Sequence, residues 1–106
     1  MLQRPETPER RALFDAANLI EKHGWVKGRL GNEQTGFCAV GAILRAMDDQ
    51  NYHYPEKIYP LVAKTLGLKS LYAELSIWND APRRTKADVV ALLRRAALLR
   101  RAALEP

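Results

Sequence analysis

The chain has 106 residues, of which 47% are hydrophobic and 27% charged; this composition fits one soluble domain with a modest core and excludes a second domain. The formal net charge of +5 lies wholly in residues 82–106, which hold seven Lys/Arg and two Asp/Glu, whereas residues 1–81 hold ten of each. One cysteine and two histidines exclude an internal disulfide and the usual closed structural zinc site.

The sequence also lacks the patterns that membrane, secreted and nucleotide-binding proteins show. No apolar run approaches the ~20 residues of a membrane-spanning helix, and the polar residues 1–11, with their prolines, do not fit a secretory signal. The glycines Gly28, Gly31 and Gly36 match neither a dinucleotide fingerprint nor a phosphate-binding loop. We therefore expect a cytoplasmic protein with no membrane contact, no metal and no cofactor.

The first predicted helix runs from residue 8 to His23. Thr7-Pro8-Glu9 is typical of a helix start, because threonine caps the helix, proline fits its first turn and glutamate favours its positive end. Gly24 follows as a left-handed stop. Residues 25–36 then contain three glycines and several polar residues, which predicts a loop of about twelve residues without a regular element.

Residues 37–47 are almost all apolar and predict a short central helix that is buried on most sides. Gly41 in its middle costs about 1 kcal/mol relative to alanine, so we expect another stretch of backbone to pass close to it. A third helix is predicted to open at Pro55 and to end at Gly67. Pro60, inside this segment, predicts either a kink or the true first turn of the helix.

Two further helices complete the predicted set. Ser70 is expected to cap a fourth, short helix that runs through Trp78, and residues 79–82 are predicted to form a turn. Thr85, with Asp88 three residues later, is typical of a capping box at the start of the last helix.

The predicted fold is an all-α, compact single domain of four or five helices around the central helix at 37–47, because no segment alternates as a strand does. Its core is expected in about residues 8–97. The unit ALLRRA at residues 91–96 is repeated at 97–102, which predicts a basic, apolar helical extension over residues 98–106. This extension either frays or offers a surface to a second copy of the chain or to an acidic partner.

The basic tail is the argument for nucleic acid as a partner. Its arginines ring the helix and do not form one stripe, which disfavours that partner. They are Arg94, Arg95, Arg100 and Arg101.

Cys38 is the candidate nucleophile. A cysteine in the first turn of a helix lies near the positive helix end, which lowers the pKa of the thiol. A cysteine enzyme also needs a base and a group that orients it. His23 is the candidate base, with His53 as an alternative, and Asn79 or Asp80 would orient it. The plainer interpretation is that Cys38 is a small buried residue and that the helix dipole favours His23 at a helix end.

Trp25 and Trp78 each flank a turn. We expect both rings to anchor the core, with their N–H groups bonded to loop carbonyls; the alternative is that they stack on a ligand. Asn79 and Asp80 are interpreted as a helix-end device, because both side chains readily bond nearby backbone N–H groups. A catalytic or metal-binding Asp80 is the alternative.

Three groups of residues together resemble a known family. They are Gly24-Trp25, then Phe37 to Ile43 with Arg45-Ala46, and finally Trp78-Asn79-Asp80-Ala81-Pro82 with Arg84-Thr85 and Val89 to Leu93. Over about residues 10–97 the chain resembles a family of short actinobacterial and phage proteins classed as a domain of unknown function. The resemblance implies a relationship without a known reaction. It directs attention to a site where the matching residues meet: Trp25, Cys38, Gly41, Trp78, Asn79, Asp80 and Thr85.

With no complete catalytic or cofactor set, the sequence favours a small non-enzymatic protein that acts through protein contacts. We expect an accessory or phage-encoded modulator of a host system that forms homo-oligomers through its C-terminal helix. The first alternative is a cysteine-dependent hydrolase or transferase that uses Cys38 with His23 and Asp80. The second alternative is a nucleic-acid-binding module that uses the basic C-terminal helix.

Overall fold

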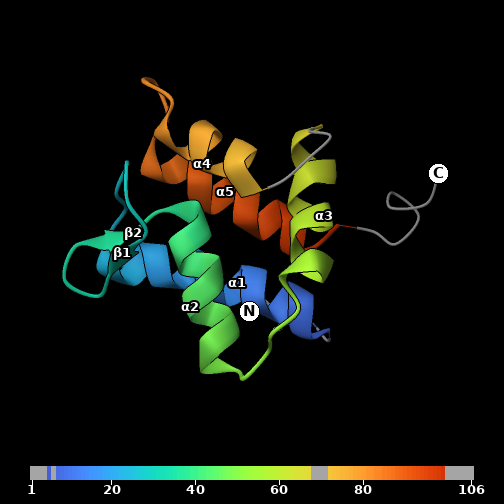
Figure 1. Ribbon diagram of the computed structural model, residues 1–106. Coiled ribbons are helices and arrows are strands. Elements are labelled where there is room, and N and C mark those ends of the chain that lie inside the picture. Colours follow the sequence, from blue (N-terminus) through green and yellow to red (C-terminus); the bar gives the residue numbers. More distant parts are fainter. Residues whose placement is uncertain (1–4, 6, 68–71, 100–106) are drawn as a thin grey trace.

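The computed structural model describes residue 5, residues 7–67 and residues 72–99, in which five helices accompany one small sheet (Figure 1). The elements are α1 (Pro8–His23), β1 (Gly31–Asn32), β2 (Gly36–Phe37), α2 (Ala39–Asp49), α3 (Pro55–Leu66), α4 (Tyr72–Asp80) and α5 (Lys86–Ala97). Helix predominates among the described residues, which confirms the predicted all-α class. The described part of the chain contains no helix of the length and hydrophobicity that crossing a membrane requires.

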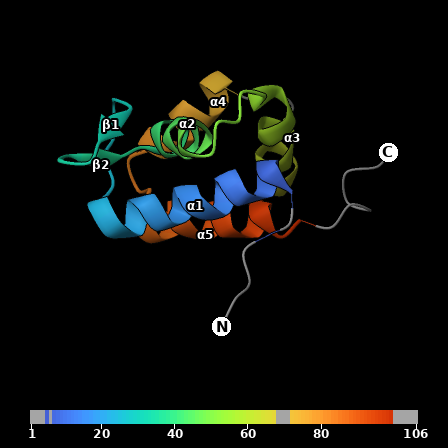
Figure 2. The same cartoon turned by 90° about the horizontal axis from the view of Figure 1, so that it is seen from below.

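The helices form two layers. α1 and α5 lie side by side and run in opposite directions, and α2 and α4 form a second layer above them (Figure 2). α3 stands at one end of the molecule and the β1–β2 hairpin at the other (Figure 1). The core lies between the layers, and the side chains of Val40 and Ile43 in α2 are fully buried there together with Leu13, Leu75, Val89 and Leu92. The prediction of a buried central helix is therefore confirmed, with bounds two residues later at each end.

The segment before α2 is more regular than predicted. β1 and β2 pair antiparallel, with Gly31 opposite Phe37 and Asn32 opposite Gly36. The side-chain oxygen of Asn32 closes the turn by accepting from the backbone N–H groups of Gln34 and Thr35 at 2.8 and 2.9 Å. The prediction that no regular element forms in residues 25–36 was wrong, because these strands pair through glycine backbone and show no side-chain alternation.

Gly36 explains how tightly this hairpin is packed. Its φ is +88°, and a Cβ atom there would lie 2.7 Å from the backbone nitrogen of Trp25. Glycine therefore allows β2 to lie directly against the chain that leaves α1, where Trp25 forms a bridge with Phe37.

The helix ends follow the predicted capping chemistry at most places. The Thr85 hydroxyl accepts from the N–H of Asp88 at 3.1 Å, and the Asp88 carboxylate accepts from the N–H of Thr85 at 3.0 Å, which confirms the capping box. Gly67 ends α3 in the predicted left-handed conformation, with φ of +73°. Gly24 ends α1 with φ of +104° and ψ of 177°, so the left-handed stop predicted there was wrong. α3 begins at Pro55, so the alternative that Pro60 starts it was wrong.

The ends of α4 and α5 set two boundaries in the C-terminal half of the chain. α4 continues through Asn79 and Asp80, so the turn predicted at 79–82 begins later, at Ala81. The predicted cap, Ser70, lies outside the described residues. α5 ends at Ala97, and residues 100–106, with Arg100 and Arg101, lie outside the described part, so the helical extension stays a prediction.

Candidate functional site

The side chain of Asn79 joins three parts of the chain. It is the one fully buried polar residue in the described core. Its Oδ1 accepts from Trp25 Nε1 at 2.8 Å and from the backbone N–H of Ala39 at 3.0 Å. Its Nδ2 donates to the carbonyl of Val26 at 3.1 Å and to Asp80 Oδ1 at 2.9 Å. The amide thus uses all its donors and two acceptor positions, and we call this group of five residues the Asn79 hub.

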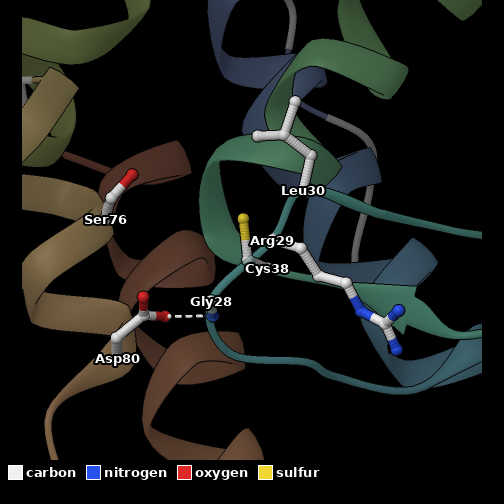
Figure 3. A pocket seen from close by; sticks show the side chains of 6 residues that line it. All are labelled: Gly28, Arg29, Leu30, Cys38, Ser76 and Asp80. Carbon is white, nitrogen blue, oxygen red and sulfur yellow. Dashed lines mark hydrogen bonds between the residues drawn. The ribbon is translucent and has the colours of Figure 1, made fainter.

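Two contacts extend the hub along the chain that follows α1. The backbone N–H of Gly28 donates to Asp80 Oδ1 at 3.0 Å, as Figure 3 shows. Lys27 Nζ donates to the carbonyl of Ala81 at 2.8 Å and lies 5.4 Å from the centroid of the Trp25 ring. These bonds tie the loop to the end of α4.

Gly41 holds the same loop against α2. A Cβ atom at this position would overlap the carbonyl oxygen of Leu30 and lie 2.7 Å from its carbonyl carbon. The carbonyl of Leu30 also accepts from the backbone N–H of Cys38 at 3.0 Å. The expectation that another backbone passes close to Gly41 is therefore confirmed, and that backbone belongs to Leu30.

A cavity of about 210 Å³ lies between this loop, the start of α2 and the end of α4. We call it the Cys38 cavity. In Figure 3 Asp80 and Ser76 stand on one side of it and Leu30 on the other, while the guanidinium of Arg29 extends away from Ser76 and Asp80. Its lining residues are Gly28, Arg29, Leu30, Cys38, Ser76 and Asp80. Leu30, Arg29 and Ser76 were not predicted as site residues.

Two of the three residues of the proposed catalytic set line this cavity. Cys38 and Asp80 do so, but His23 is not among the lining residues. The ring of His23 packs edge-on against Phe37, with centroids 6.0 Å apart. His53 is exposed and bonds Asn51 Oδ1 at 2.9 Å. The structure thus gives Cys38 no histidine neighbour within its cavity.

The environment of Cys38 is that of a helix cap. Only 5% of the residue is exposed, and its Sγ accepts from the backbone N–H of Gly41 at 3.3 Å. Burial raises the pKa of the Cys38 thiol, the charge of Asp80 acts in the same direction, and the hydrogen bond from Gly41 opposes them. The plainer interpretation of Cys38 as a small buried residue is therefore confirmed. The lowered pKa of the nucleophile alternative was wrong, because burial outweighs the helix N-terminus.

The remaining predicted site residues have separate positions. Arg84 stacks on Trp78, with its Cζ 3.9 Å from the ring centroid, and its Nε donates to the Trp78 carbonyl at 2.9 Å. Thr85 is occupied as the cap of α5. Arg94 and Arg95 are exposed on α5. The Trp25 ring bonds the Asn79 amide, whereas a loop carbonyl was predicted as its acceptor.

No group of three or more His, Cys, Asp and Glu residues that could hold a metal ion is found among the residues that the structure describes.

The comparison with protein families identifies the chain. The model of the family of unknown function DUF6197 matches residues 4–99, so the chain belongs to this family. No curated protein and no solved structure matches the chain. The matched range contains the Asn79 hub and the Cys38 cavity.

Proposed function

We propose that this member of the DUF6197 family is a non-enzymatic helical protein that binds another protein through the surface beside the Cys38 cavity. Ile77 carries this proposal, because 71% of it is exposed, the largest value among the exposed large hydrophobic residues described. It follows Ser76, which lines the cavity, and Leu30 on the opposite wall is 47% exposed. Exposed apolar side chains beside a hollow are typical of a protein-binding surface.

The Asn79 hub lies beneath this surface and favours a protein-binding role over a catalytic one. Asn79 and the Oδ1 atom of Asp80 already bond groups of the chain itself, so they hold the loop in one arrangement. A surface ordered before binding loses less entropy when a partner docks. The Cys38 thiol has a raised pKa and caps α2, and His23 packs on Phe37. Both observations favour the binding role over the cysteine-enzyme alternative.

The C-terminal tail is the second part of the proposal. Leu98 is 63% exposed where α5 ends, and Arg94 and Arg95 are exposed beside it. We propose that residues 98–106 add an apolar and basic contact, either to the same partner or between two copies of the chain. We also propose a cytoplasmic protein, encoded by a phage or acting as an accessory modulator of a host system.

The test compares partner recovery from the native host after crosslinking. Ile77→Asp and Leu30→Asp are expected to lower recovery of a specific partner about tenfold or more, because charge is placed in the contact. Tyr54→Asp is the control, since Tyr54 is 53% exposed but lies at the start of α3, away from the cavity. Equal recovery with all three variants would refute the proposed surface.

Deletion of residues 98–106 tests the tail separately. Analytical ultracentrifugation measures self-association, and the same crosslinking experiment measures partner recovery. If both remain as in the full chain, the tail has no part in binding.

A further inference from the structure

A second cavity, of about 450 Å³, is lined by residues of α3, α4 and α5 and of the turn between α4 and α5. We call it the Trp78 cavity. The residues it takes from α5 recur at i, i+3 and i+7, so they share one face of that helix. The described residues that line it are Leu66, Trp78, Arg84, Asp88, Ala91 and Arg95.

Two arginines of this cavity have unused donors. Arg84 is held in place by its stack on Trp78 and by its Nε bond to the Trp78 carbonyl, and its two terminal amino groups bond none of the described residues. The side chain of Arg95 is exposed and forms neither a hydrogen bond nor an ion pair with any described residue. Arg45, by contrast, forms ion pairs with Glu33 and Asp49. The cavity therefore presents two guanidinium groups that form no ion pair with a carboxylate of the described chain.

The net charge of the lining residues favours a ligand with a single negative charge. Asp88 opposes the two arginines, so the described residues of the lining carry a formal charge of +1. One Asp88 oxygen already accepts from the backbone N–H of Thr85, which holds this carboxylate at the cavity. A dianionic phosphate ester would meet repulsion from Asp88, whereas a carboxylate would balance the charge.

The other walls are apolar. Leu66, Ala91 and the indole of Trp78 line the cavity beside the arginines. Guanidinium groups bind a carboxylate through paired N–H donors, and apolar walls favour a hydrocarbon or aromatic body joined to it. We infer that the Trp78 cavity binds a carboxylate attached to an apolar or aromatic body.

The probe is N-acetyl-L-phenylalanine, compared with its uncharged carboxamide, with acetate and with phenyl phosphate. Binding is followed by the NMR signal of the Trp78 indole N–H during titration, with the Trp25 indole as an internal reference, since Trp25 lies in the Asn79 hub. The acid is expected to shift the Trp78 signal in a saturable way, while the amide and acetate bind at least about tenfold more weakly because each lacks one half of the contact.

Arg95→Ala and Arg94→Ala form a matched pair of variants. Both residues are exposed neighbours on α5 and both changes remove one positive charge, but only Arg95 lines the cavity. Arg95→Ala is expected to raise the dissociation constant of the acid about tenfold, as loss of a charge-assisted hydrogen bond requires. Arg94→Ala is expected to leave it within about twofold, because only screened long-range attraction changes.

Three results would overturn the inference. Equal weakening by the two variants would mean that the acid responds only to net charge. Binding of the amide as tight as that of the acid would remove the role of the carboxylate. Tighter binding of phenyl phosphate than of the acid would mean that the cavity binds a phosphate ester and not a carboxylate. Leu30 and Ile77 do not line this cavity, so its failure would leave the proposed protein-binding surface untouched.

Discussion

Replacement of Asn79 by alanine removes the hydrogen bonds that join the loop, α2 and α4. Two buried or half-buried donors, Trp25 Nε1 and the N–H of Ala39, lose their acceptor, and the Val26 carbonyl loses its donor. A buried polar group left unsatisfied costs about 1–3 kcal/mol, so these losses together amount to about 3–5 kcal/mol. Since a domain of this size is stable by roughly 5–15 kcal/mol, Asn79→Ala should remove a large share of that stability.

Urea unfolding, followed by helical circular dichroism, measures this loss as a lower midpoint at unchanged slope. Asn18→Ala is the matched control, because Asn18 is an exposed amide on α1, and a change within about 0.5 kcal/mol is expected there. Asn79→Asp should be at least as harmful as Asn79→Ala, since a carboxylate would face the Val26 carbonyl and Asp80 without a donor. If Asn79→Ala lay within about 1 kcal/mol of the control, the hub would not hold these elements together.

Three further predictions concern single residues of the same region and of α5. Gly41→Ala should cost about 1–3 kcal/mol and speed hydrogen exchange at the Cys38 amide, because the new methyl group displaces the Leu30 carbonyl that accepts from it; unchanged exchange would contradict this. The raised pKa of Cys38 predicts slower alkylation by iodoacetamide at pH 8 than for free cysteine. Alkylation as fast as that of free cysteine would refute the burial argument. The contribution of the protonated Cys38 thiol to the free energy of unfolding is complete below its ordinary pKa of 9.0 and is lost as pH rises through the higher folded value. Thr85→Ala should cost about 1 kcal/mol in urea unfolding through loss of the α5 cap; no measurable change would show that the capping box adds nothing.

Features set by neighbours in the chain were predictable. Thr85 and Asp88 of the capping box are three positions apart, and Gly67 ends α3 through its own positive φ. Gly41 was also informative, because a glycine inside an apolar helix indicates a close approach. The sequence could not say which segment approaches, since Leu30 reaches Gly41 through the path of the loop.

Features set by distant partners were not predictable. Asn79 was expected to bond nearby backbone, but its side chain bonds Trp25, 54 residues away, and Ala39, 40 residues away. The apolar neighbours of Cys38 indicated a buried residue, and its position at a helix start indicated a lowered pKa. The sequence could not say that burial outweighs the helix end, because the depth of burial depends on distant elements. The β1–β2 hairpin was missed because glycine and Asn32 create it through backbone pairing and a turn.

The end of α4 connects the two proposed sites. Successive residues of a helix point about 100° apart, so three neighbours can face three surroundings. Trp78 faces Arg84 and the Trp78 cavity, Asn79 faces the core, and Asp80 faces Gly28 and the Cys38 cavity. Because Asn79 fixes the rotation of this turn through bonds to the loop and α2, loosening it should disturb both cavities together. Loss of Arg95 from the surface of α5 should instead affect the Trp78 cavity alone.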